Sequence, residues 1–518
     1  MVQLVLSFNF LERRETPVER PGARAWAGLA LLSLPTVLLG LDVTVLYLVL
    51  PSLAADLEPT AAQTLWIMDA YGLLIAGFLI TMGSLGDRIG RRRLLSVGVV
   101  AFGLFSVLAA FAPTAKWLIA ARALLGVAGA TLMPSTLALV GTLFPEPRHR
   151  ALAIGIWATM FALGMAAGPV VGGALLAHLP WGSVFLLAVP VAAVVAAAAP
   201  FLLPEHRVPG RGGFDLPGVA LSLGALLPLV YAVKHLAADG PDPWTLGAAL
   251  LGAVCSVLFV RRQLRSPEPL LDVSLFADRA FSAALLVLLV GLVGVGGVMF
   301  LVTQYLQLVE GLPATEAGLW MGPPALAMLA AAVGAPLAAR RIRPGTVMAA
   351  TLGASLAGYA LLAAAGPGER VCVVAGFTLV YLGLGSIAAL GTDIVVGAAP
   401  ADRAGSAAAV SETVQELGLA VGVVLLGGLS TAVHRSRVAP PDDAPAAVAA
   451  RVGEGLSGVR SVAHRLPEAT VRDAVDAFVA GLNLAALATG PVVAVLAVVC
   501  AVALRHVRPI GAGTGGGH

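Results

Sequence analysis

Four carboxylates and one arginine lie inside long apolar segments of the chain. Asp42, Asp69 and Arg122 fall in its first half, and Glu412 and Glu416 fall in its second half. An ionised side chain at the centre of a membrane-spanning helix costs at least ~2.5 kcal/mol, so each of these groups needs a countercharge, a proton or a hydrated cavity. The chemistry open to them is the binding and release of protons and the attraction of a cation.

Glu412 and Glu416 are four residues apart, which places both carboxylates on one face of a helix. Two such groups in a poorly hydrated cavity hold a proton more tightly than one exposed carboxylate does, and together they attract a lipophilic cation. The sequence therefore predicts a proton-coupling and cation site here. An alternative that the sequence leaves open is a pair of acids turned toward a helix interface.

Asp42 and Arg122 fall at similar depths in their helices when each residue is given the α-helical rise, so the two side chains could pair. Asp69 lies in the same half of its own helix and would be a third member of the group. We hypothesise that Arg122 sets the proton affinity of Asp42, because a nearby cation favours a charged carboxylate. A purely structural ion pair is the alternative.

The composition is that of a chain solvated by lipid. Charged residues make up 12% and hydrophobic residues 58% of the 518 residues, whereas a soluble domain is about one quarter charged. The net charge of +3 is small and its arginines are scattered, so nucleic acid is not an expected partner. The chain has no phosphate-binding loop with a lysine, and its histidines lack metal-ligand spacing. We therefore expect no nucleotide, cofactor, metal or enzymatic activity.

Fourteen windows are long and apolar enough to span a bilayer, which needs roughly 20 residues each. The sequence predicts an all-α integral membrane protein with spans at 26–50, 64–84, 94–112, 117–142, 151–177, 183–203, 215–236, 245–261, 280–307, 316–338, 346–365, 371–397, 406–431 and 480–504.

The arginines gather in alternate loops, and positive charge is retained in cytoplasmic loops, so we expect a multi-pass protein of the plasma membrane with both termini in the cytoplasm. The chain has two lysines against thirty arginines, and this usage together with its many alanine, glycine and valine residues indicates a bacterial source. A faint similarity between the two halves predicts two related six-helix bundles. The expected divisions are a tail at 1–25, a bundle at 26–205, two additional spans at 206–265, a second bundle at 266–505 and a tail at 506–518. The loop 433–479 would be extracellular, and its composition fits a helical hairpin or a solvated linker about equally.

Three motifs carry a resemblance to a known family. The run Gly83-Ser-Leu-Gly-Asp87-Arg88-Ile-Gly90-Arg91 resembles the loop between spans two and three of major facilitator superfamily transporters. The fifth span resembles the signature of the antiporter branch of that superfamily, and this signature comprises Gly155, Gly164, Gly168, Pro169, Gly172 and Gly173. The first span, Leu41 to Pro51, resembles that of drug/proton antiporters, with Tyr47 where asparagine is usual.

The resemblance implies the major facilitator fold with two extra spans, and the activity of a fourteen-span multidrug or quaternary-ammonium efflux antiporter. The expected partners are protons, the lipid bilayer and a small lipophilic, cationic substrate. In this superfamily an aspartate at the position of Asp87 is thought to latch the inner gate, and the residues Gly83, Arg88, Gly90 and Arg91 surround it. Balancing of nearby arginines by Asp87 is the alternative. A narrow exporter of an antibiotic or metabolite, or a sensor that has lost transport, remain the alternative functions.

Overall fold

The computed structural model describes residues 22–205, 215–238, 242–266, 273–398, 404–441, 444–507 and 509. The described residues form helices and no strand. Thirteen of these helical segments are long and apolar enough to cross a membrane, and α8 (Leu216–Ala238) adds a shorter apolar stretch at Leu216–Ala232. The all-α membrane fold predicted from the hydropathy pattern is therefore confirmed.

The helices fall into three consecutive groups along the chain. The first group comprises α1 (Ala23–Leu57), α2 (Ala61–Ile89), α3 (Arg91–Ala110), α4 (Ala115–Leu143), α5 (Pro147–Leu176), α6 (Ser183–Leu186) and α7 (Ala188–Leu202). The second is α8 with α9 (Pro243–Arg265). After the 3-10 turn η1 (Val273–Ala277), the third comprises α10 (Arg279–Gln304), the π-helical turn η2 (Tyr305–Val309), α11 (Ala314–Trp320), α12 (Gly322–Ala339), α13 (Pro344–Ala364), α14 (Arg370–Ala398), α15 (Ala404–Arg437) and α18 (Glu468–Ala503).

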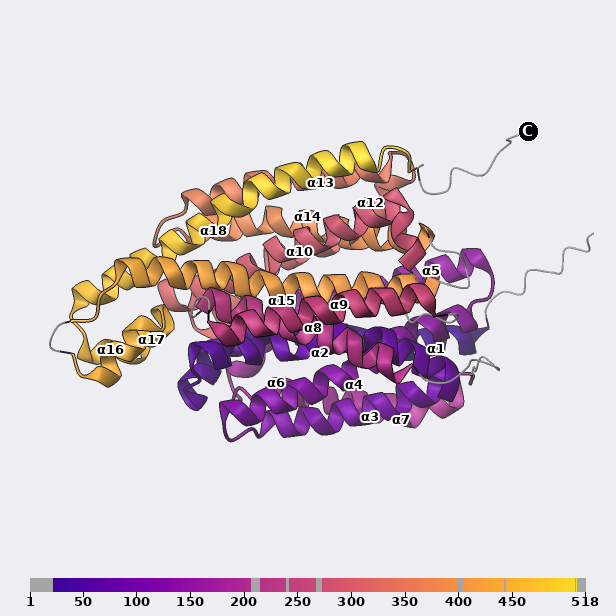
Figure 1. Cartoon of the computed structure of the whole chain (residues 1–518), viewed down its shortest axis with the longest axis horizontal. Helices are drawn as coiled ribbons and strands as arrows, with labels where there is room; N and C mark the ends of the chain where they lie inside the picture. The colour runs from indigo at the N-terminus through magenta and orange to yellow at the C-terminus, as the bar shows by residue number, and fades with distance from the viewer. Residues whose placement is uncertain are drawn as a thin grey trace, which may run out of the picture.

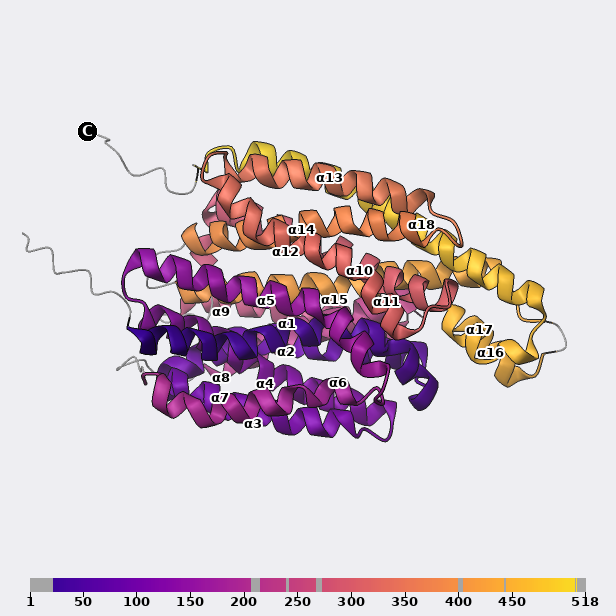
Figure 2. The ribbon, with the colours of Figure 1, turned by 180° about the vertical axis from the view of Figure 1, so that it is seen from behind.

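The long helices run nearly parallel to one axis of an elongated bundle (Figures 1 and 2). In both views α1 to α7 occupy one side and α10 to α14 with α18 occupy the other. The helices α2 and α15 meet along the seam between these sides, and α5 meets α11 and α12 along the same seam on the opposite face. The helices α8 and α9 pack together, and α8 lies against α2 and α15 (Figure 1). Residues from both sides of the bundle therefore meet along the seam.

The charged run predicted as a loop between spans two and three is almost entirely helical. Helix α2 continues to Ile89 and α3 begins at Arg91, so Gly90 is the one residue between them. Gly90 has a φ of 107°, a backbone conformation that residues with a side chain rarely adopt. The loop predicted between spans two and three is therefore shorter than expected, because a single glycine is enough to reverse the chain here.

The segment 433–479 is mostly helical in the described residues. Helix α15 continues to Arg437, two short helices follow at α16 (Ala446–Gly453) and α17 (Leu456–Ser461), and a 3-10 turn, η3, covers Ala463–Arg465. Helix α18 begins at Glu468, twelve residues before the span predicted at 480–504. The predicted span starts too late because the first turns of the helix are polar. Of the two alternatives from composition, the helical one is correct.

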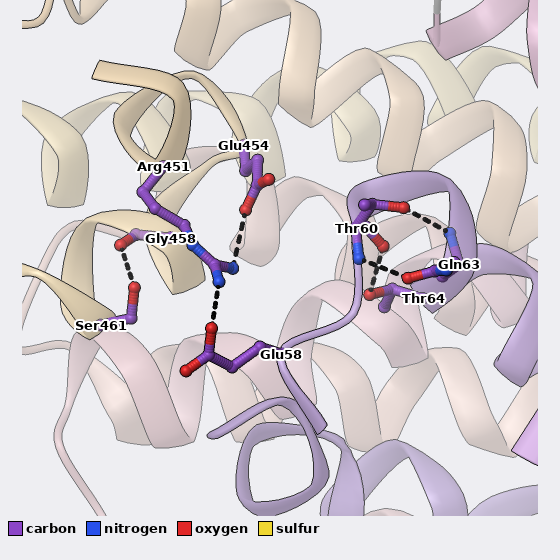
Figure 3. A network of polar contacts seen from close by, with 8 residues as sticks. All are labelled: Glu58, Thr60, Gln63, Thr64, Arg451, Glu454, Gly458 and Ser461. Atoms are coloured by element: carbon purple, nitrogen blue, oxygen red, sulfur yellow. Dashed lines mark hydrogen bonds and ion pairs between the residues drawn. The ribbon is translucent and has the colours of Figure 1, made fainter. Parts of the chain in front are cut away.

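The two short helices extend beyond one end of the bundle and fold back over the α1–α2 turn (Figures 1 and 3). Arg451 of α16 forms an ion pair with Glu58, at a distance of 2.6 Å, and a second one with Glu454 at 3.3 Å. His434 of α15 contacts the carbonyl oxygen of Val452 through Nε2 at 2.9 Å. These contacts join α16 to both sides of the bundle.

Candidate functional site

Asp42 and Arg122 form a buried ion pair in the first group of helices. Arg122 Nη1 donates to Asp42 Oδ2 at 2.7 Å, and Arg122 Nε donates to the carbonyl oxygen of Ile67 at 3.2 Å. The side chains are 2% and 10% exposed, respectively. The guanidinium also lies over the ring of Tyr71, 4.4 Å from its centroid, in a cation–π contact. The arginine is therefore held from α1 and α2 at once.

Glu412 and Glu416 of α15 lie across the seam from this ion pair. Both line a small cavity that also includes Tyr71, and Glu416 is buried. The carboxylate of Glu416 lies within electrostatic reach of Glu412, Arg122 and Asp42. Four of the five charged residues predicted to act together therefore form one group across the seam, with Tyr71 between the acids of α15 and the ion pair.

Asp69, the fifth predicted residue, is also buried, two positions before Tyr71 on α2. The carboxylate of Asp69 interacts electrostatically with Tyr47 of α1. Tyr47 also interacts electrostatically with Glu416 and Arg122. The tyrosine at the position where asparagine is usual is thus part of the charged group. Its buried hydroxyl stands among the acids that surround the seam.

The cavity between these side chains is small, about 10 Å³, which is about the space of one water molecule. Its remaining walls are apolar and come from Leu39, Val43, Ile75, Leu79, Met133 and Phe161. A pocket for a drug-sized molecule needs roughly 300 Å³ or more. The helices therefore have to separate before such a molecule can reach Glu412 and Glu416.

Three hydrogen bonds cross the seam away from the cavity or at its edge. Gln307 of η2 donates to the carbonyl oxygen of Leu48 at 3.1 Å, and Thr315 of α11 donates to that of Gly173 at 3.0 Å. Thr413 of α15 donates to the carbonyl oxygen of Ala76 at 3.4 Å. Each bond uses a side chain from the third group of helices and a backbone oxygen from the first, so each can break without leaving a charge unpaired.

Several other residues of the third group of helices lie away from this cavity. Trp320 packs against Arg370, whose guanidinium carbon is 5.2 Å from the ring centroid. Gln304 and Met321 are buried outside the cavity wall, and Asp393 is exposed near the end of α14. The Tyr305 hydroxyl lies 2.8 Å from a carboxylate oxygen of Glu310 and 2.7 Å from the carbonyl oxygen of Gly366, and it can donate to one of them at a time. None of these residues reaches Glu412 or Glu416 in this conformation.

The glycine pattern of the fifth span brings α5 very close to two neighbours. A side-chain carbon at Gly164 or Gly168 would overlap atoms of α1, namely the carbonyl oxygen of Val37 and the hydroxyl of Thr44. At Gly172 it would lie 2.6 Å from a methyl group of Val45, and at Gly173 it would lie 2.8 Å from the carbonyl oxygen of Ala314.

Two members of the pattern behave differently from these four. The carbonyl oxygen of Pro169 abuts Gly318 of α11, whereas Gly155 meets open space. The pattern therefore packs α5 against α1 on one face and against α11 across the seam.

The charged run at the α2–α3 junction is held by backbone contacts. Arg91 is buried, its Nη1 lies 3.5 Å from the carbonyl oxygen of Pro134, and its side chain packs on Gly86. Gly83 has ordinary contact with Pro134, and Arg88 is half-buried. The side chain of Asp87 lies outside the described residues, so the role of Asp87 as a latch stays a prediction.

The sequence did not predict two features of the structure, one at the charged group and one at the end of the bundle. Tyr71 touches both Arg122 and the cavity, and the only signal for it was a polar aromatic residue inside an apolar helix. The Arg451 to Glu58 ion pair joins positions almost four hundred residues apart, and nothing in either segment indicates the other.

Comparison with known proteins gives a consistent result. The family model described as Major Facilitator Superfamily matches residues 32–423. The multidrug efflux pump LfrA of Mycolicibacterium smegmatis is 42% identical over 492 residues, covering 94% of this chain and 98% of that protein. The methyl viologen resistance protein SmvA of Salmonella typhimurium is 33% identical over 484 residues, covering 92% and 97%.

A solved structure supports the fold. A bacterial homologue of the human lysosomal transporter Spinster, in an inward-facing and unoccupied conformation, superimposes with a TM-score of 0.60 at 17% identity, over 93% of this chain and 97% of that one. Fold, family model and relatives agree, and the chain belongs to the Major Facilitator Superfamily, as a transporter related to multidrug efflux pumps.

Proposed function

We propose that this protein is a proton-coupled antiporter that exports lipophilic cations across the plasma membrane by alternating access. The observation that carries the proposal is the position of Glu416, a buried carboxylate that lines the seam cavity and lies within electrostatic reach of the Asp42–Arg122 pair. A carboxylate so placed can hold either a proton or a cationic substrate. Competition between the two ligands for one site couples their movements in opposite directions.

The remaining residues have supporting roles in this proposal. Glu412 adds a second negative charge beside Glu416, and the rings of Tyr71 and Phe161 offer aromatic surface to a cation. Arg122 pairs with Asp42 in this conformation, and its charge also attracts the carboxylate of Glu416. A relative named for resistance to methyl viologen, which is itself a cation, supports this substrate class.

We place both termini in the cytoplasm and the α16–α17 segment outside the cell, following the arginine distribution. The seam contacts of Gln307 and Thr315 then lie on the outer side of Glu416 and close the outer path. The run from Gly83 to Arg91, with Asp87, would control the inner path. The glycines of α5 let that helix slide against α1 and α11 between the two conformations.

The direct experiment uses the purified protein in liposomes with an imposed proton gradient. Uptake of ethidium, a permanently charged cation, and the internal pH are followed together. We expect gradient-driven movement of the dye with opposite movement of protons. Dye movement without proton movement, or no movement of any cation by folded protein, would contradict the proposal and favour an exporter of neutral or acidic compounds or a sensor.

A further inference from the structure

The carboxylate of Glu416 lies directly against a residue that has no side chain. A Cβ atom built on Gly72 of α2 would be 2.9 Å from Glu416 Oε2, closer than real Cβ atoms come to a neighbour. Among the described residues, no other heavy atom outside the glycine's own helix lies within 4 Å of that position. The space at Gly72 is therefore occupied by one group, the carboxylate end of Glu416.

The neighbouring residue, Tyr71, faces the other charged groups. Its ring lies under the Arg122 guanidinium and lines the cavity with Glu416. Its hydroxyl is buried and has no hydrogen-bond partner within the described part of the chain. Two consecutive residues of α2 thus contact the carboxylate of α15 and the cation of α4.

We infer that Gly72 is a positioning residue for Glu416, because the absence of a side chain at residue 72 allows the carboxylate to reach α2 beside Tyr71. This inference deepens the proposed function and rests on it, since it names what fixes the proton-binding group. From this position Glu416 faces Glu412 on its own helix, Asp42 and Tyr47 of α1, Arg122 of α4 and Tyr71 of α2. A shift of the carboxylate changes its distance to all of them.

The substitution Gly72→Ala separates positioning from folding. The atom that must yield is the end of a flexible side chain, so the helices need not move and the protein should fold normally. Ordinary contact begins near 3.4 Å, so the carboxylate has to move by about 0.5 Å. Glu416→Asp shortens the side chain by one methylene and removes the overlap, which makes it a specific partner for the alanine.

The matched control is Gly141→Ala in α4, where an added Cβ meets nothing within 4 Å. Two measurements are made on full-length protein in liposomes: the pH midpoint of gradient-driven ethidium transport, and the pH dependence of carbodiimide labelling of Glu416 followed by mass spectrometry. Carbodiimide reacts with protonated carboxyl groups, so the second measurement does not depend on transport.

We expect Gly72→Ala to shift both midpoints by at least about threefold in proton concentration, about half a pH unit, with unchanged protein yield. In the Glu416→Asp background the same alanine should produce no further shift. Unchanged midpoints in Gly72→Ala, or an equal shift in the Glu416→Asp background, would overturn the inference. If wild-type protein carries no proton-coupled dye, the proposed function fails, and the labelling midpoints still decide whether Gly72 positions Glu416.

Discussion

Removal of Arg122 tests whether the attraction between opposite charges in the buried ion pair stabilises the fold. In Arg122→Met the chain keeps a residue of similar length, but Asp42, with a side chain 10% exposed, loses its countercharge. The carbonyl oxygen of Ile67 and the ring of Tyr71 also lose their partner. Removing one member of a buried pair costs about 3 to 5 kcal/mol, which is about a hundredfold to a few thousandfold in the unfolding equilibrium.

The double variant Asp42→Asn/Arg122→Met removes both charges and leaves no unpaired ion. Because much of the cost in the single variant is the isolated carboxylate, we expect the double variant to recover at least about 2 kcal/mol of the lost stability. We expect neither Arg122→Met nor the double variant to carry out proton-coupled transport, since both lack the charged pair.

The assay is detergent-induced unfolding of the purified proteins, followed by tryptophan fluorescence. Arg370→Met is the matched control, because Arg370 is exposed and contacts only the ring of Trp320 among the interactions found for it. Its effect should stay below about 1 kcal/mol. A double variant that is no more stable than Arg122→Met would refute the reasoning, since the loss would then come from packing and not from an uncompensated charge.

Three further predictions follow from contacts away from the cavity. The hydrogen bond from Arg262 lowers the pKa of Asp215, so this carboxylate stabilises the fold above its unfolded pKa near 4 and the contribution is lost as the pH falls through its lower folded pKa. Asp215→Asn should therefore reduce the unfolding temperature slightly at pH 7 and by less at pH 3, and an equal reduction at both pH values would contradict this. Arg451→Met should change the unfolding free energy by less than about 1 kcal/mol, because Glu58 is 71% exposed, yet should speed thermolysin cleavage within 444–466 severalfold; unchanged cleavage would argue against docking by this pair. Gly164→Ala should lower transport and thermal stability because its Cβ overlaps a backbone oxygen of α1, whereas Gly155→Ala should match wild type, and similar behaviour of the two variants would contradict the close approach of α5 and α1.

The type and the approximate position of most spans could be read from the sequence because each span must bury about the same length of apolar chain. The predicted window at 316–338 matches the combined segment Ala314–Ala339, for example, although the structure divides it at Met321. The start of α18 at Glu468 could not be found that way, since its first turns carry Arg472, Asp473 and Asp476 and lack a hydropathy signal. One glycine replacing an entire loop at residue 90 is also a backbone property that composition does not reveal.

Part of the candidate site could be predicted from the sequence for a similar reason. A fixed rise per residue predicts that Asp42 and Arg122 lie at one depth, and the structure joins them at 2.7 Å. Which face of α2 turns toward α15 depends on the packing of two helices distant in sequence, so the contacts of Tyr71 and Gly72 could not be derived. The contact of Gln307 with the carbonyl oxygen of Leu48 depends on the π-helical turn in which Gln307 lies.

The central claim is that a proton on Glu416 is exchanged for a cationic substrate. The most direct measurement compares wild-type and Glu416→Gln protein in liposomes, in ethidium exchange at equal pH on both sides and in ethidium accumulation driven by a proton gradient. Glu316→Gln, a change at an exposed acid of α11, is the matched control. We predict that Glu416→Gln abolishes gradient-driven accumulation and its pH dependence while the control retains both. Normal gradient-driven accumulation with a normal pH profile in Glu416→Gln would contradict the account.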